Sequence, residues 1–459
     1  MMAAALGRSR YLLLFVFSAG VVTPRADAQS TAWRDVKNEC ALAFSIATRN
    51  TVEACGVAIF QAEPAHPLIQ GLGPGITATG FGGTIVDSFE FLPFSKSGRF
   101  QNQVSLSGAY SPNGFWFTEA KLDITHPALA PKSYREHSQN DRLEIIPFAR
   151  TDYRSKLDFY GLGPQSSLSN YVRYREDMSE IGLTISNPVS RWLEFGGEIN
   201  GQWLSDGPPD NTSIRPIQEV FTNQTVPGIS INTEMMHFQG LVRRPAKSQC
   251  FPEPNARCPK PVDWITGRYF DYSVQYDLYH DIRAGLYSFQ RMTIDLEQPF
   301  TLRRLRSARS DWLCSDNQQN GCQFGQFVMR ERFVASFTGK GNAVPLSFQQ
   351  QLGGTDIAGA DTLLGFRDLR FRGPDMLLIQ AQYFHPIWNP FHLMLFYDSG
   401  QVANQIGAVS ASNLRQDWGV GLVFALQNDP VNHAIFRFTV GFGSGEGVQY
   451  KPRFAPSFQ

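Results

Sequence analysis

The sequence predicts an all-β protein, a transmembrane antiparallel β-barrel of about sixteen strands with a long loop folded into its lumen. Apolar and polar residues alternate along extended segments, aromatic residues make up 13% of the chain, and charged residues make up only 18%. This composition fits a wall with one face toward lipid and the other toward water. The 41 basic and 41 acidic side chains cancel. Nucleic acid is therefore not expected as a partner, because phosphate binding needs a basic excess.

The N-terminus has the pattern of a secretory signal peptide. Arg8 and Arg10 precede the apolar run 11–22, and Ala26-Asp27-Ala28 resembles a cleavage site. A membrane anchor is the alternative, but a run of about a dozen residues is short of the roughly 20 that span a bilayer. The expected domains are a signal peptide over 1–28, a short periplasmic segment over 29–75 and the barrel over 76–459.

Alternation with a period of two residues marks the strands. In 270–278, aromatic and aliphatic side chains share one face while Asp, Ser and Gln share the other. Such runs reach about ten to thirteen residues, the length of a tilted membrane-crossing strand, whereas strands of soluble sandwiches have about five or six. The expected strands are 77–86, 102–111, 114–126, 142–153, 171–186, 192–204, 229–243, 265–280, 284–299, 329–340, 344–352, 376–388, 391–402, 414–427, 434–443 and a weaker one at 448–458. Because single-chain bacterial barrels have even strand numbers, about sixteen is the expected total.

Cysteine usage agrees with export. The six cysteines form three pairs close in sequence, namely Cys40 with Cys55, Cys250 with Cys258, and Cys314 with Cys322. Small disulfide loops fit an oxidising compartment, although six cysteines allow fifteen pairings and the connectivity stays open. A metal site is the alternative. The chain has no C-x-x-C motif, so we expect neither a metal nor another cofactor.

The chain carries no recognisable catalytic motif. It contains no G-x-S-x-G, no Walker A loop, no G-x-G-x-x-G and no H-E-x-x-H. We therefore expect no enzymatic activity. An enzyme built on a barrel is the alternative.

One region, 351–400, departs from the plain barrel pattern. It holds a long glycine-bounded loop with three arginines and two phenylalanines, predicted to fold inward over 355–374. In the strand after it, Phe391 and Tyr397 share the face assigned to lipid, so Asp398 points into the lumen. A lumenal carboxylate needs a partner, and arginines of an inward loop could supply it. An ordinary solvated external loop is the alternative.

These residues resemble the bacterial surface antigen family, the superfamily of outer-membrane protein assembly factors and two-partner-secretion translocators (BamA- and TamA-like barrels). Its members carry a loop motif of Val or Leu, Arg, Gly and Phe or Tyr, followed one hairpin later by F-x-D-x-G. Here Leu363, Gly365 and Phe366 match three positions of the loop motif, with Leu364 at the position of the arginine, and Phe396, Asp398 and Gly400 match the second motif fully. Residues 159–164 and 419–421 also resemble the family. The resemblance is strongest over 344–443 and places the loop between the eleventh and twelfth expected strands.

The resemblance implies an outer-membrane barrel that inserts membrane proteins or translocates polypeptides. Its implied partners are outer-membrane lipid and unfolded outer-membrane or secreted polypeptides. Leu364 replaces the motif arginine, so Arg367 or Arg370 would have to contact Asp398 in its place. The segment 29–75 is too short for the polypeptide-transport-associated modules that members usually carry before the barrel. A passive pore or a structural surface barrel is the alternative function.

A feature of the last expected strand fits the implied activity. Pro452 and Pro456 interrupt it, and each proline removes a backbone N–H from the ladder. A seam of this kind between the first and last strands would be weakly closed, which is compatible with polypeptide insertion.

Overall fold

The computed structural model describes the greater part of the chain from residue 76 onward. The described ranges are 76–77, 80–81, 85–91, 101–111, 114–131, 142–164, 166–190, 192–210, 213–229, 231–245, 271–304, 322–388, 391–425 and 434–454. All belong to one compact unit, Leu68–Gln459. The predicted signal peptide and the segment 29–75 lie outside these residues and stay predictions.

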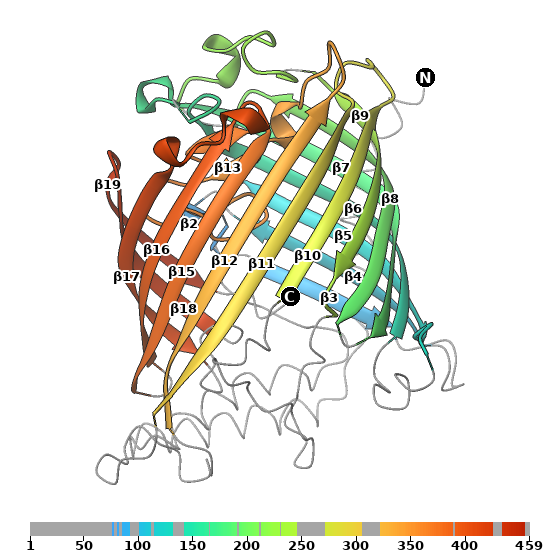
Figure 1. Cartoon of the computed structure of the whole chain (residues 1–459). Coiled ribbons are helices and arrows are strands. Elements are labelled where there is room, and N and C mark those ends of the chain that lie inside the picture. The colour runs from blue at the N-terminus through green and yellow to red at the C-terminus, as the bar shows by residue number, and fades with distance from the viewer. Residues whose placement is uncertain are drawn as a thin grey trace, which may run out of the picture. The chain divides into compact units, whose positions relative to one another are not determined.

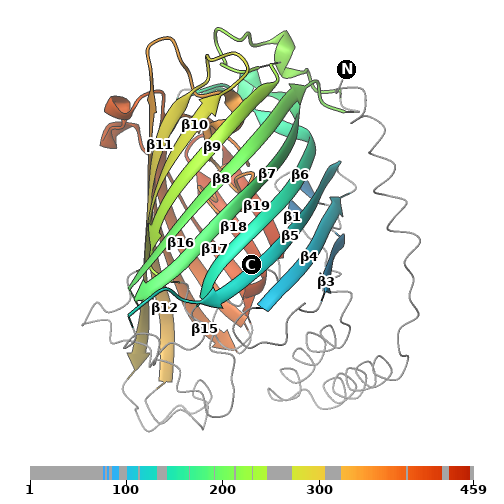
Figure 2. The same ribbon diagram turned by 90° about the vertical axis from the view of Figure 1, so that its right-hand side faces the viewer.

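Fifteen antiparallel strands form one sheet in which nearly every strand pairs with its neighbours in sequence. The strands are β3 (Ile85–Phe91), β4 (Gln101–Ser111), β5 (Phe115–Pro127), β6 (Arg142–Phe159), β7 (Val172–Ser190), β8 (Leu193–Gly207), β9 (Thr233–Arg243), β10 (Asp271–Asp281), β11 (Phe289–Arg304), β12 (Cys322–Thr338), β15 (Asp375–Trp388), β16 (Phe391–Ala403), β17 (Arg415–Ala425), β18 (Ala434–Gly443) and β19 (Gly447–Phe454). Figures 1 and 2 show these strands tilted and curving around a common interior. The predicted antiparallel barrel architecture is confirmed.

The three predicted disulfides cannot be compared with the structure. Of the six cysteines, only Cys322 is among the described residues, and it is described by its backbone at the start of β12. Cys40, Cys55, Cys250, Cys258 and Cys314 all lie outside the described ranges. The pairings of Cys40 with Cys55, of Cys250 with Cys258, and of Cys314 with Cys322 therefore stay predictions.

The edge strands of the sheet are β3 and β19. Within the described ranges, no hydrogen-bonded ladder joins these two strands. A small hairpin of β1 (Ile76–Thr77) and β2 (Gly80–Phe81) precedes β3, and β1 lies beside β19.

The two faces of the wall have opposite chemistry, and the apolar face is the outer one. On β16, the outward Leu393, Leu395 and Tyr397 are 37%, 43% and 46% exposed, whereas Met394 and Asp398 are fully buried inside. Exposed outward residues of other strands include Ile181, Phe195, Ile199, Trp203, Phe238, Val274, Tyr276, Leu278, Trp418, Val420 and Leu422. A soluble protein would bury such residues, so the arrangement fits a wall surrounded by lipid.

No helix among the described residues is both long and apolar enough to cross a membrane. The helical elements of the described residues are short 3-10 turns. They are η2 (Leu168–Asn170), η3 (Ile217–Glu219), η6 (Leu346–Phe348), η7 (Ile406–Ala408) and η8 (Ala411–Asn413).

Two expected strands differ from the structure. Residues 77–86 are divided among β1, β2 and the start of β3. Residues 344–352 do not enter the wall but form η6 and the three-residue β13 (Gln350–Leu352). Pro345 precedes η6 and cannot donate to a ladder, while Leu346 is buried in an apolar cluster with Leu157 and Tyr174. The loop therefore lies between the tenth and eleventh strands of the sheet, not between the eleventh and twelfth.

The weaker strand expected at 448–458 is present as β19, and Pro452 lies opposite Phe438 of β18.

The long loop is folded into the interior, as predicted. Its base is a small sheet of β13 and β14 (Phe371–Gly373). The loop residues Leu363, Leu364, Phe366 and Leu369 are each no more than 2% exposed. An ordinary solvated external loop would leave them exposed, so that alternative is wrong.

Candidate functional site

The site is the contact between the inward loop and the lumenal faces of β15 to β19. Each residue of the strand motif has a distinct place in it. Phe396 belongs to an apolar cluster with Leu364 of the loop, and Asp398 is fully buried. A Cβ at Gly400 would lie 3.1 Å from Leu352 Cδ1. A larger residue at Gly400 would therefore crowd the base of the loop.

Two neighbouring carboxylates bind the loop through its backbone. The N–H of Leu364 donates to Asp398 Oδ2 over 3.3 Å, and the N–H of Gly365 donates to Asp417 Oδ2 over 2.8 Å. Asp398 of β16 and Asp417 of β17 are direct cross-strand partners. Gln380 of β15 joins them by donating to Asp398 Oδ1 over 3.2 Å and to a loop carbonyl. A hydrogen bond within a protein typically contributes about 0.5–1.5 kcal/mol to stability.

Gly365 is required here because the loop backbone lies directly against the wall. A Cβ on Gly365 would lie 2.6 Å from Asp417 Cβ and 2.8 Å from the backbone N of Gly443. A Cβ on Gly441 would meet Gly365 Cα at 2.7 Å. Glycines on β18 therefore leave the space into which the loop tip fits.

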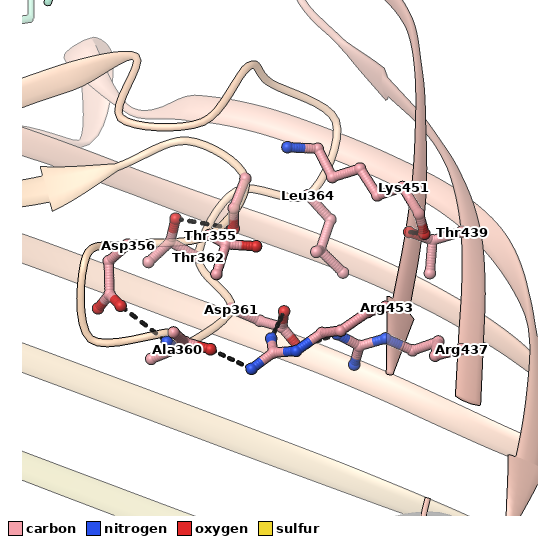
Figure 3. Close-up of polar contacts among 12 residues, drawn as sticks. Thr355, Asp356, Ala360, Asp361, Thr362, Leu364, Arg437, Thr439, Lys451 and Arg453 are labelled. Atoms are coloured by element: carbon pink, nitrogen blue, oxygen red, sulfur yellow. Dashed lines mark hydrogen bonds and ion pairs between the residues drawn. The ribbon is translucent and has the colours of Figure 1, made fainter. Parts of the chain in front are cut away.

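A buried aspartate of the loop is fixed by two arginines from the last two strands. Asp361 pairs with Arg437 of β18 and Arg453 of β19, and Arg453 also donates to the carbonyl of Gly359. Figure 3 shows Asp361 beside the two guanidinium groups. Burial alone would raise the pKa of Asp361, but the two arginines outweigh it and lower this pKa to about 2.

Further charged contacts connect the loop to β19 and to the turn before it. Lys451 Nζ lies 2.5 Å from Asp368 Oδ1. Glu446 pairs with Arg370 and lies 3.5 Å from Arg367. Arg370 is buried against Tyr160 and Phe371 rather than solvated. Charged side chains of the loop thus form ion pairs with oppositely charged side chains of β19 and of the turn before it.

The predicted substitution of Arg367 or Arg370 for the motif arginine is wrong. Both arginines pair with Glu446, and Arg370 also donates to Ser166 Oγ over 2.7 Å. Asp398 is satisfied by a backbone N–H and by Gln380 instead. This frees position 364 for an apolar side chain, and Leu364 is 2% exposed among other apolar residues.

The other predicted loop residues come together with the base of the loop. Leu363 and Phe366 pack in one buried cluster with Leu352, Phe371, Met376, Leu378 and Val402. Residues 159–164 also lie against the loop, since the N–H of Gly163 donates to the carbonyl of Arg372 over 2.7 Å. Of residues 419–421, Gly419 lies opposite Phe396 in register.

Sequence reasoning missed several residues of the site, namely Asp361, Asp417, Arg437, Glu446, Lys451 and Arg453. The alternation of β17 carried a signal for Asp417, since it lies on the face opposite Trp418, Val420 and Leu422. Nothing in the sequence indicated the ion pairs of Asp361, because this residue lies 76 residues from Arg437 and 92 residues from Arg453.

The lumenal face of β6 to β10, away from the loop site, is polar as well. Arg150 Nη2 lies 2.5 Å from Glu180 Oε1, and Gln202 donates to the same carboxylate. His237 Nε2 lies 2.9 Å from Asp277 Oδ1. No group of three or more potential metal ligands was found in the described ranges.

Comparison with solved structures shows the fold. BamA from Haemophilus ducreyi lacking POTRA domains 1–3 matches with a TM-score of 0.50 and 11% identity, over 83% of this chain and 68% of that chain. CdiB from Acinetobacter baumannii matches with a TM-score of 0.42 and 13% identity, over 81% of this chain and 57% of that chain. OpdQ from Pseudomonas aeruginosa matches with a TM-score of 0.21, 7% identity and coverages of 77% and 92%. No family model and no curated protein matches the sequence. The chain shares the barrel fold of BamA.

Proposed function

We propose that this chain is a bacterial outer-membrane barrel that inserts membrane proteins or translocates polypeptides. The observation that carries the proposal is the inward loop, whose backbone and charged side chains are bound to lumenal residues of β16 to β19. A passive pore conducts through a water-filled lumen. A loop held in the lumen by this many contacts fits that function less well.

The edges of the sheet support the same function. Strands at an edge present unpaired N–H and C=O groups, which can pair with an incoming strand. Among the described strands, β3 and β19 are such edges, and the loop is bound to β19 through Lys451 and Arg453. The loop is therefore connected directly to the strand at which an incoming polypeptide would pair.

The partners follow from the two faces of the wall. Outer-membrane lipid surrounds the apolar outer face, and an unfolded outer-membrane or secreted polypeptide is the transient client. The predicted signal peptide supports export to this membrane. The proposal requires no enzymatic activity and no cofactor.

Conductance of the purified chain in planar lipid bilayers tests the proposal. A barrel that holds its loop inside gives small, irregular openings. Large, steady openings with a linear current–voltage relation would identify a passive pore and overturn the proposal. The variant Asp361→Asn extends the test, because releasing the loop should make openings larger.

A further inference from the structure

One charged side chain interrupts the lipid-facing surface of β12. Odd-numbered residues of this strand face outward, because Phe337 is 47% exposed while Val328 and Val334, on even positions, are 1% and 0% exposed. Glu331 therefore faces outward, and it is exposed. The positively charged neighbours Arg330 and Arg332 face the lumen, so they cannot neutralise it.

Glu331 lies within the apolar belt rather than at its rim. Its cross-strand partners are Leu296 of β11 and Ile379 of β15, both apolar. Phe327 and Phe337 lie on the same face, on the two sides of Glu331 along the strand. With about 2.3 Å of depth per residue for a strand tilted by about 45°, Glu331 lies about 9 Å from the level of Phe327 and about 14 Å from that of Phe337. Both offsets fit inside an apolar band about 25 Å tall.

A second polar side chain lies in the same patch. Gln298 of β11 is paired in register with Met329 of β12, so it is the diagonal neighbour of Glu331 on the outer face. Within the described ranges, neither the Glu331 nor the Gln298 side chain has a hydrogen-bond or ion-pair partner. Polar groups in hydrocarbon are costly unless they are paired. A carboxyl acceptor and an amide donor without partners therefore lie as diagonal neighbours in one patch of the outer face.

We propose that the outer face of β11 and β12 is the interface between two copies of this chain in the membrane. Glu331 of each copy accepts a hydrogen bond from Gln298 of the other. A twofold interface is self-complementary, so one acceptor and one donor on a single patch satisfy each other twice. Ala381 of β15, in register with Met329, is the diagonal neighbour of Glu331 on its other side. A small residue at this place allows two membrane proteins to approach closely.

The interface is independent of the proposed insertion or translocation activity. In the sheet, β11 and β12 are separated by several strands from both edge strands, β3 and β19. A dimer formed through β11 and β12 leaves those edges accessible. Loss of the dimer and loss of the activity are therefore separate outcomes.

The test is photo-crosslinking in native membranes with a photoreactive amino acid at Phe333. We expect a product of twice the mass of the chain, and none from the same group at Ile199 of β8. Glu331→Leu and Gln298→Leu should each weaken dimerisation about tenfold, because each removes two hydrogen bonds per dimer. Gln298→Lys should increase the crosslinked fraction, because a charged donor replaces a neutral one. Gln298→Glu should abolish it through repulsion.

Heat-modifiable gel mobility verifies that every variant forms a barrel. The proposal is overturned if crosslinking at Phe333 captures only other proteins or lipid. It is equally overturned if folded Glu331→Leu gives the same dimer yield as the native chain. Unchanged outer-membrane protein levels in the Glu331→Leu strain would leave the insertion or translocation activity intact.

Discussion

The backbone N–H of Gly365 donates to Asp417 over 2.8 Å, directly after the N–H of Leu364 donates to Asp398. Two adjacent strands thus hold two consecutive loop amides. Backbone recognition makes the loop position insensitive to the side chain at 364 but dependent on the two carboxylates and on the glycine.

Replacing Asp398 should loosen the loop. Asp398→Ala leaves the buried N–H of Leu364 without its acceptor, at a cost of about 1–3 kcal/mol, and removes one of the two acceptors of the Gln380 amide. Trypsin cleavage after Arg367 in intact cells measures the effect, since this side chain is 49% exposed. Asp398→Asn keeps one acceptor oxygen, so trypsin should cleave it more slowly than the alanine variant. Equal resistance of native and alanine proteins would refute a role for this pairing.

Replacing Asp361 should release the other side of the loop. Asp361→Asn leaves two partly buried guanidinium groups uncompensated, and breaking a buried pair costs about 3–5 kcal/mol. Hydrogen exchange of the loop amides should accelerate by at least an order of magnitude. Glu234→Gln is the matched control, because its pair with Arg283 is exposed and worth about 0–1 kcal/mol. Similar exchange in the two variants would contradict the anchoring role.

The loop should open in acid within a defined pH window. The pKa of Asp361 is lowered from 3.8 to about 2, so its ion pairs contribute fully above about pH 4. Their contribution is lost as the pH falls toward about 2. Bilayer conductance of the native chain should rise between these values, beyond any rise in Asp361→Asn. If conductance changed with pH in the same way in the native chain and in Asp361→Asn, the ion pairs of Asp361 would not hold the loop.

Adding one methyl group at the loop tip should displace it. Gly365→Ala would place a Cβ 2.6 Å from Asp417 Cβ, and neither backbone can retreat without breaking hydrogen bonds. We expect faster tryptic cleavage in the loop. Gly407→Ala is the control, because a Cβ there has no neighbour within 4 Å. An unchanged cleavage rate in Gly365→Ala would show that the contact is looser than described.

A charged residue introduced on the outer face should destabilise the folded barrel by an amount that depends on its depth in the membrane. Leu395→Arg places a cation in the belt and should destabilise the folded barrel by about 2–4 kcal/mol, measured by unfolding in denaturant with lipid present. Ser205→Arg lies two residues beyond the exposed Trp203 and should cost about 0–1 kcal/mol. Equal effects at both positions would argue against a lipid-facing wall.

The wall and the inward loop could be predicted from the sequence because both follow from alternation. Once Leu395 and Tyr397 face lipid, Asp398 must face the lumen, and a buried carboxylate demands a partner. The prediction of a wall strand at 344–352 was wrong because it rested on alternation alone. It took no account of Pro345 or of the apolar cluster in which Leu346 is buried.

The partner of Asp398 could not be predicted. Every residue except proline carries a backbone N–H. Nothing in the sequence therefore distinguishes the N–H of Leu364 as the donor to Asp398. The arginines Arg367 and Arg370 were visible, but their acceptor, Glu446, belongs to a turn 76 residues beyond Arg370. Only the folding of the wall around the inward loop brings these groups together.

The measurement that tests the proposed function most directly is depletion of this chain followed by an inventory of the outer-membrane and secreted proteins. The proposal predicts that other β-barrel proteins, or a defined exported polypeptide, are lost in step with the depleted chain, while their synthesis continues. An inventory that changes only in this chain, together with slower uptake of small polar solutes, would contradict polypeptide handling and identify a passive pore.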